Sequence, residues 1–289
     1  MTIALVLLSG LVTVALIIYI LTQKGTKRFT RLATIYTILF FGLFSSLFVR
    51  NMDWQLLSTS INKSGTQVHV IEPIEAVVAH AEARESQIKK SVLIDAPVIK
   101  QFPELPRGCE VTSLAMLLQH AGVKIDKMTL AKEVKKDPTP YKKENGKIYF
   151  GNPNFGFVGD MYSFNNPGFG VYHRPIAVLA NVYLPDRIID LTGKDFEEVQ
   201  KHLSDEKPVW VITNVHYKEL PSSLFQTWHT NDGVIDITYK EHSVLITGYD
   251  EHYIYFNDPQ KGTKNKKAPK DDFIKSWVQM GRQAITYYD

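Results

Sequence analysis

The chain has 289 residues, of which 44% are hydrophobic and 22% are charged, as in a globular protein of one or two domains with some membrane segment. Residues 1–90 carry nine Lys or Arg and five Asp or Glu, whereas residues 91–289 carry 24 Lys or Arg and 25 Asp or Glu. The excess of basic residues therefore lies in the N-terminal part. The larger part gives no electrostatic reason to expect nucleic acid as a partner, and the single cysteine excludes a disulfide within the chain.

Two apolar stretches without charged residues open the chain, at residues 2–22 and 32–49. As helices they would be about 27–32 Å long, which is roughly the thickness of the hydrocarbon core of a bilayer. Four basic residues lie between them, so residues 1–50 are predicted to form a transmembrane helical hairpin whose loop faces the cytoplasm. The alternatives are a single signal anchor or a cleaved signal peptide, although residues 1–20 contain no Lys or Arg.

Residues 51–90 are predicted to be an extracytoplasmic tether, first polar and prone to turns, then helical in spacing with alternating charge. Because both ends of the hairpin would lie outside the cytoplasm, the rest of the chain is expected to face outside at the cell membrane. That compartment is oxidising. An unpaired cysteine risks oxidation there, so its presence indicates a chemical role.

Residues 91–289 are predicted to form one α+β domain, in which helices come first and a largely antiparallel sheet follows. In the segment 107–122, apolar residues recur at the i, i+3, i+4, i+7 spacing of a helix, and Gly122 is a natural terminator. The expected helices are 107–122, 128–136, 195–205 and 271–280, and the expected strands are 91–102, 208–215, 242–250, 252–258 and 282–288.

Cys109 is the only cysteine, and it stands where the apolar helix of residues 107–122 begins. A helix N-terminus presents unpaired N–H groups and about half a positive charge, which favours a thiolate. The neighbouring Glu110 works slightly against this by adding negative charge. A nucleophilic thiol is therefore the hypothesis, and a small buried apolar residue is the alternative.

A nucleophilic cysteine needs a histidine that takes its proton and a third group that orients the imidazole. His242 begins the first strand of an expected hairpin whose turn lies near residue 250, and this register puts it opposite Asp258. A slip of one residue would place Asn257 there instead, so both stay open as the third residue. His229, in a turn-rich stretch, is the rival for the base.

His242 and Asp258 follow Cys109 by 133 and 149 residues, within the range of about 130–150 for the His and Asn of papain-like enzymes. The stretches KQFPELPRGCEVTSLAMLL, GFVGDMYSFNNPGFGVYHRPI, KPVWVITN and HSVLITGYDEHYIYFNDP resemble the C39-like branch of the papain-fold cysteine peptidases. The resemblance runs from about residue 93 to the C-terminus. Its specificity comes from the Q…GC, H and DP elements occurring together in this order.

The resemblance implies a papain-like fold and roles at the matching positions. Cys109 would attack a carbonyl, His242 would act as base and then acid, and Asp258 would orient His242. Gln101 matches the glutamine whose side-chain amide, with the backbone N–H of the cysteine, donates to the oxyanion. Exporter-linked C39 peptidases trim leader peptides, but this chain has no ATPase, so that substrate is not carried over.

The expected function is that of a membrane-anchored cysteine hydrolase that cleaves amide bonds of a peptide or cell-envelope substrate through a thioester. No cofactor is expected, and without HExxH, CxxC or an acidic calcium loop no metal is expected either. One alternative is an acyltransferase or transpeptidase, in which an amine replaces water. Another is a non-catalytic module that binds a peptide or a partner.

Residues 149–172 are rich in Gly, Asn and aromatic residues and are expected to form a loop. Because long loops in compact domains often bind ligands, this loop is expected to line the substrate cleft. The basic run 260–270 is expected to be a solvated loop. The loop's aromatic residues, which could hold peptide side chains or belong to the core, are Phe155, Phe157, Tyr162 and Phe169.

Overall fold

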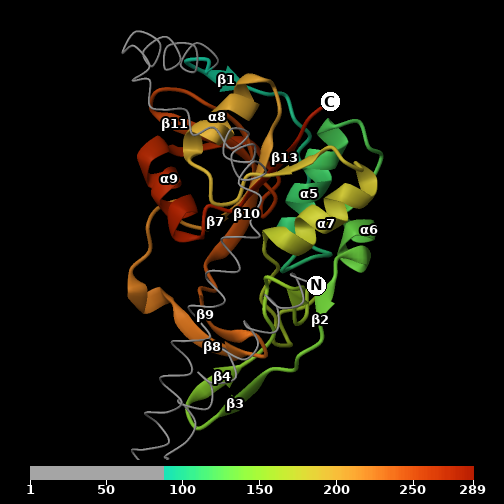
Figure 1. Cartoon of the computed structure of the whole chain (residues 1–289), viewed down its shortest axis with the longest axis vertical. Helices are drawn as coiled ribbons and strands as arrows, with labels where there is room; N and C mark the ends of the chain where they lie inside the picture. Colours follow the sequence, from blue (N-terminus) through green and yellow to red (C-terminus); the bar gives the residue numbers. More distant parts are fainter. Residues whose placement is uncertain (1–87) are drawn as a thin grey trace, which may run out of the picture. The chain divides into compact units, whose positions relative to one another are not determined.

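The computed structural model of the chain describes residues 88–289, which lie within one compact unit (Figure 1). The predicted hairpin of residues 1–50 and nearly all of the predicted tether lie outside the described residues. No helix in the described part of the chain is long and apolar enough to cross a membrane. The predicted fold class, which put two transmembrane helices before the domain, is therefore corrected to a mixed α+β fold.

An antiparallel sheet of seven strands forms the centre of the domain. Its middle strand, β10 (Glu241–Tyr249), is buried along almost its whole length. It pairs with β11 (Tyr253–Asp258) on one side and with β7 (Val209–Asn214) on the other. Beyond β11 lies β12 (Thr263–Pro269), and beyond β7 lie β13 (Ala284–Tyr287) and β6 (Ile188–Asp190).

A short strand, β1 (Val92–Leu93), pairs with the last two residues of β10. Gly248 permits this close approach, because a Cβ there would lie 2.1 Å from the carbonyl oxygen of Val92. The expected strand 91–102 is wrong beyond these two residues. The chain leaves the ladder, and Asn257 Nδ2 donates to two of its carbonyl oxygens instead, those of Ala96 and Pro97, at 3.1 and 2.8 Å.

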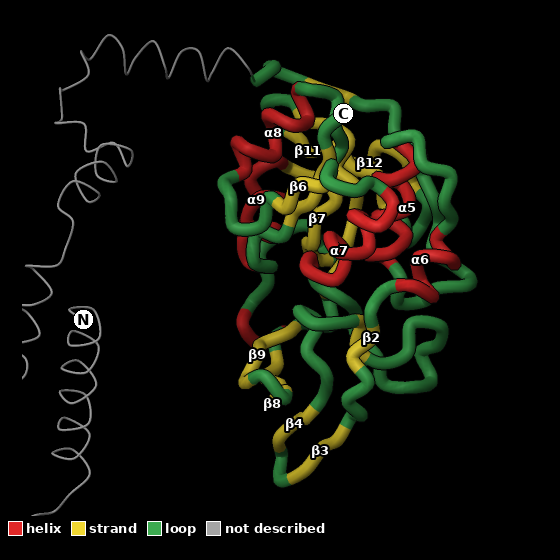
Figure 2. Tube along the Cα trace, turned by 45° about the vertical axis from the view of Figure 1, so that its right-hand side comes forward, coloured by secondary structure: helices red, strands yellow, loops and turns green. Residues whose placement is uncertain are grey.

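Helices cover both faces of the central sheet. Figures 1 and 2 show α5 (Cys109–His120) and α7 (His173–Tyr183) on one side, and α8 (Phe196–Ser204) and α9 (Lys270–Gln279) on the other. Since side chains alternate along a strand, one face of β7 meets α5 and the other meets α9. This arrangement explains why all six residues of β7 are buried.

Two hydrogen bonds fix these layers. Trp210 Nε1, on one face of β7, donates to the carbonyl oxygen of Glu110 at 3.0 Å. The hydroxyl of Thr213, on the opposite face, pairs with that of Ser276 in α9 at 2.7 Å.

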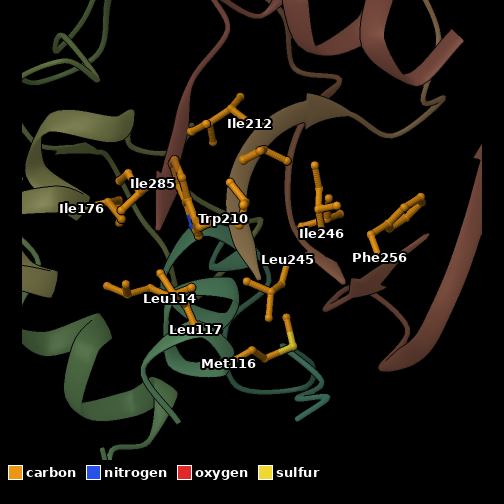
Figure 3. Close-up of a cluster of buried hydrophobic side chains, with 14 of the residues drawn as sticks. Leu114, Met116, Leu117, Ile176, Trp210, Ile212, Leu245, Ile246, Phe256 and Ile285 are labelled. Carbon is orange, nitrogen blue, oxygen red and sulfur yellow. The ribbon is translucent and has the colours of Figure 1, made fainter. Parts of the chain in front are cut away.

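The main core lies between α5 and the sheet, where Leu114 and Leu117 approach Trp210 and Leu245 (Figure 3). All four side chains are fully buried, and burying a side chain of this size stabilises a fold by about 1.5–3 kcal/mol. Helix α5 is buried from Cys109 to Leu118 without a solvent face. Its first residue is therefore held rigidly against the sheet.

A second, smaller sheet extends from one end of the domain (Figure 2). Its strand order is β3-β4-β8-β9, in which β4 and β8 are parallel. A separate cluster built around Trp228 fills the space between this sheet and the loop that precedes α7. The strands are β3 (Lys142–Glu144), β4 (Lys147–Tyr149), β8 (Gln226–Thr230) and β9 (Gly233–Ile237).

Several elements differ from the sequence prediction. Helices do not all come first, since α7, α8 and α9 alternate with strands. The second helix, α6 (Lys127–Glu133), begins at Lys127, because Asp126 caps it through the N–H groups of Met128 and Thr129. The basic run 260–270 contains the edge strand β12, whose lysines protect an open edge from pairing. Some elements were not predicted from the sequence. They include α7, β6, β8, β9 and the parallel pair of β2 (Lys136–Asp137) and β5 (Phe157–Val158).

Candidate active site

Cys109 is the first residue of α5, and its side chain is 6% exposed. The backbone of Ser243, in β10, lies at the Cys109 sulfur and favours its charged form. One turn further along α5, the hydroxyl of Ser113 donates to the carbonyl oxygen of Ser243 at 3.2 Å. The packing of α5 on β10 therefore brings the thiol to the residues that flank His242.

The resting thiol is neutral. Burial raises the pKa of Cys109 well above its ordinary value, and the carboxyl groups of Glu110 and Glu241 raise it further. A helix N-terminus stabilises an anion by only about 0.3–1 kcal/mol, or about 2 kcal/mol in favourable cases, whereas desolvating a charged group costs several kcal/mol. Burial therefore outweighs the helix dipole, and the thiolate predicted from the helix start is not the resting form.

Glu110 and Glu241 lie beside the thiol. Cys109 Sγ donates to Glu110 Oε2 at 3.4 Å, and Glu110 Oε1 accepts from the N–H of Val171 at 2.7 Å. One ligand atom each of Cys109, Glu110 and Glu241 lies within 4.8 Å of the other two. A Cβ on Gly170 would stand 2.2 Å from Glu110 Oε1 and 3.3 Å from Glu241 Oε2, so glycine leaves the room that the carboxyl groups fill.

Burial makes both of these carboxyl groups weak acids. It raises the pKa of Glu110 to about 7. The pKa of Glu241 is raised well above the ordinary value, by burial first and then by the negative charge of Glu110. The pair therefore holds a proton near neutral pH.

His242, the second residue of β10, is buried, and its Nε2 lies 2.9 Å from Asp258 Oδ1. Near the turn the register differs from the predicted one by three residues, but a bulge between Ile246 and Gly248 reduces the difference to two, so that Leu245 pairs with Asn257 and not with residue 255. An even shift keeps the same face of each strand, and diagonal neighbours remain within reach. The contact between His242 and Asp258 forms for this reason although the predicted pairing is wrong.

Asp258 is fully buried, and both of its oxygens are occupied. Oδ1 accepts from His242 and from the N–H of Gln260 at 2.9 Å. Oδ2 accepts from the hydroxyl of Tyr217 at 2.9 Å and from Lys266 Nζ at 2.8 Å. Burial raises the pKa of Asp258, but the contacts with His242 and Lys266 outweigh it and hold the pKa well below its usual range.

The alternatives that the sequence left open lie elsewhere in the fold. Asn257 points away from His242 and binds the N-terminal segment, and it also accepts from the N–H of Asn265 at 2.9 Å. His229 lies in β8, where its ring packs on Tyr149 with centroids 5.2 Å apart. Among residues 88–289, the structure gives His229 no contact with Cys109 or with a carboxylate.

Gln101 is buried next to the Asp258 loop, because its N–H donates to the carbonyl oxygen of Pro259 at 2.8 Å. Its side-chain Nε2 donates to the carbonyl oxygens of Leu105 and Pro106, at 3.2 and 3.0 Å. Its Oε1 is buried without a hydrogen-bond partner. Both amide protons are therefore engaged in this state, and the role of Gln101 as an oxyanion donor stays a prediction.

The structure does not bring the thiol and the imidazole into hydrogen-bonding contact. In the described part of the chain, the hydrogen bond of the Cys109 thiol goes to Glu110. Nε2 of His242 is taken by Asp258, which leaves Nδ1 as the nitrogen that could exchange a proton. Catalytic hydrogen bonds are often long before substrate binds and shorten in the complex with substrate.

Only the end of the loop 149–172 reaches this site, where Val171 and Gly170 meet the carboxyl groups. Phe157 and Phe169 are buried in the two hydrophobic cores, so they do not hold substrate side chains in this structure. Phe155 and Tyr162 are 40% and 46% exposed.

Sequence reasoning missed three side chains of the site: Tyr217, Glu241 and Lys266. Lys266 belongs to the basic run 260–270, in which nothing distinguishes it from the neighbouring lysines. In the structure it pairs with Phe256 between β12 and β11, which brings it close to Asp258. Glu241 precedes His242 directly, which was the available signal. Tyr217 lies in the turn after β7, where no periodicity points to it.

Comparisons with known proteins cover the same region. The family model described as "Peptidase_C39 like family" matches residues 93–285, which include Cys109, His242 and Asp258. The uncharacterized protein YvpB of Bacillus subtilis (strain 168) is 50% identical over 183 residues, which are 63% of this chain and 70% of that protein. The chain is also similar to a crystal structure from Bacillus anthracis, of a protein proposed to be a C39-like peptidase. The two share 48% sequence identity with a TM-score of 0.65, and the match covers 70% of this chain and 98% of the Bacillus anthracis chain.

Proposed function

Because this chain belongs to the Peptidase_C39 like family, we propose that it is a cysteine peptidase that hydrolyses amide bonds through a thioester on Cys109. One observation carries the proposal. An imidazole held by a buried carboxylate, His242 with Asp258 at 2.9 Å, stands at the start of the strand against which the Cys109 helix packs.

In the proposed reaction, Cys109 turns from Glu110 towards His242, and its proton passes to Nδ1 as the sulfur attacks the carbonyl carbon of the substrate. The C–N bond then breaks, and the leaving amine takes the proton from His242. Water attacks the thioester with His242 again as base, which releases the acid and restores the thiol. The backbone N–H of Cys109, at the helix start, is a donor for the oxyanion.

Asp258 acts as the anchor of the imidazole. Its hydrogen bond fixes the ring with Nε2 turned away from the reaction and Nδ1 free for proton transfer. Lys266 and Tyr217 hold the second carboxylate oxygen, so Asp258 cannot rotate without breaking two contacts.

A library of diverse peptides, incubated with the purified full chain and analysed by mass spectrometry, tests the proposal. Cleavage is expected with the native chain and not with a folded Cys109→Ala variant. Cleavage that persists in Cys109→Ala would overturn it. Adding a free amine to the same assay identifies acyl transfer, because the new product then carries the amine in place of water.

A further inference from the structure

A thiol and two carboxyl groups converge at the start of α5. Cys109 and Glu110 come from the helix and Glu241 comes from β10, and their ligand atoms lie within 4.8 Å of one another. We propose that these three side chains bind a divalent transition-metal ion of the zinc type, and that the bound ion holds the nucleophile inactive.

Glu241 carries an unsatisfied acceptor atom at this site. Glu241 Oε1 is buried and has no hydrogen-bond partner, and an unpaired buried acceptor is costly. Within residues 88–289, neither Glu110 nor Glu241 forms an ion pair with Lys or Arg. A cation between the two carboxyl groups would satisfy the free oxygen and would lie closer to their charge than Lys136, whose attraction for Glu110 acts without an ion pair.

The three donor groups suit an ion of the zinc type. Thiolate binds zinc-type ions and disfavours Ca²⁺ and Mg²⁺, while carboxylate oxygens complete many zinc sites. With bonds of about 2.3 Å to sulfur and 2.0–2.2 Å to oxygen, ligands of a tetrahedral ion stand roughly 3.5 Å apart. Cys109 Sγ and Glu110 Oε2 already lie 3.4 Å apart.

The thiol already points towards one of the two carboxyl groups. In this structure Cys109 is turned to Glu110, the arrangement that a metal would need, and not to His242. Gly170 closes the site without a Cβ, which would collide with Glu110 Oε1. Binding would release to solvent the thiol proton and the proton that the carboxyl pair holds, and it would involve no electron transfer, so a chelator would reverse it.

Cobalt is the probe, because a Co²⁺–thiolate bond absorbs in the near ultraviolet. Titrating Co²⁺ into the purified full chain should produce this band with one ion per chain, and Zn²⁺ should displace it. The band should be absent in Cys109→Ala. Glu241→Gln should weaken binding by more than about tenfold, since even residues behind the ligands are worth about 10–100-fold.

The matched control is Glu251→Gln, which replaces an exposed glutamate in the turn after β10. This variant should bind Co²⁺ like the native chain.

Protection of Cys109 from iodoacetamide by Zn²⁺ gives a second readout, and Glu110→Gln gives a second variant if Glu241→Gln does not fold. A native chain without the band, or binding that is unchanged in both glutamine variants, would overturn the proposal. Metal binding does not depend on the proposed peptidase function, whereas the inhibition of the nucleophile by the metal rests on it. A chain that binds Co²⁺ here but cleaves no peptide would therefore refute the peptidase function and leave the metal site standing.

Discussion

The thiol of Cys109 donates to Glu110, its neighbour in the chain, with Sγ 3.4 Å from Oε2, while the imidazole of His242 is held by Asp258. The proposed nucleophile and its proposed base are thus each bound to a carboxyl group before substrate arrives. Catalysis then requires the thiol to exchange one partner for the other. The two carboxyl groups at Cys109 oppose this exchange, because both raise the pKa of the thiol.

Replacing Glu241 should make Cys109 more reactive. Glu241 adds to the rise in the thiol pKa that burial causes, so Glu241→Gln should lower that pKa and speed alkylation by iodoacetamide at about pH 8 several-fold. The rate is read by mass spectrometry of the intact chain. Glu251→Gln should leave the rate unchanged, and an equal rate in Glu241→Gln would show that this carboxyl group does not act on the thiol.

The same carboxyl pair should make the fold less stable as the pH rises. In the unfolded chain Glu110 ionises near pH 4.3, but in the folded chain burial raises its pKa to about 7. The folded state therefore holds more protons between about pH 4 and 7, so the free energy of unfolding should fall as the pH rises through that window. Urea unfolding at about pH 5 and 8 measures this loss, which Glu110→Gln should reduce. If the free energy of unfolding rose between these two pH values, and rose less in Glu110→Gln, the raised pKa of Glu110 would be wrong.

Removing Lys266 should impair the anchor of the imidazole. Lys266 helps His242 to depress the pKa of Asp258, so Lys266→Met should raise that pKa and move the acid limb of peptidase activity to higher pH. The stability contributed by Asp258 is present above about pH 3.9 and is lost as the pH falls, so acid unfolding should also begin at higher pH. Lys267→Met is the matched control, because Lys267 lies on the same strand but stacks over Tyr253, with Nζ 4.2 Å from the ring centroid. Identical pH profiles for the two variants would rule out a positioning role for Lys266.

Asp258→Asn should lower kcat/KM by about 10²-fold or more, since an amide orients an imidazole less well than a carboxylate does. Its nitrogen would also face the hydroxyl of Tyr217 and the ammonium of Lys266, which both donate in the native chain. The measurement uses the best peptide found in the library assay, with the surface variant Asp236→Asn as control. Activity within about twofold of the native chain would remove Asp258 from the mechanism.

Much of the central architecture could be predicted from the sequence. The apolar spacing after Cys109 placed a helix that the structure has at Cys109–His120, and the two strands around residue 250 form the β10–β11 hairpin. The contact between His242 and Asp258 was also reachable, because a period of two along each strand tolerates an even error in register.

Other features depend on contacts between distant segments, which one sequence does not display. The strand expected at 91–102 fails because β7 occupies the edge of β10 from Ile246 back to Glu241, so the carbonyl groups of Ala96 and Pro97 accept from Asn257 instead. The neutral state of Cys109 follows from burial and from Glu241, which is 132 residues further along the chain. The helix N-terminus does favour the thiolate, but its effect is smaller than the cost of desolvation.

The most direct test of the account measures the rate at which iodoacetamide alkylates Cys109, from about pH 6 to 10, in the native chain and in His242→Ala. If His242 takes the thiol proton, the native chain should react at least about tenfold faster near pH 7, and this advantage should shrink towards pH 10, where hydroxide begins to replace the imidazole. Equal rates near pH 7 would mean that the imidazole does not reach the thiol, and the assignment of Cys109 and His242 as nucleophile and base would be wrong.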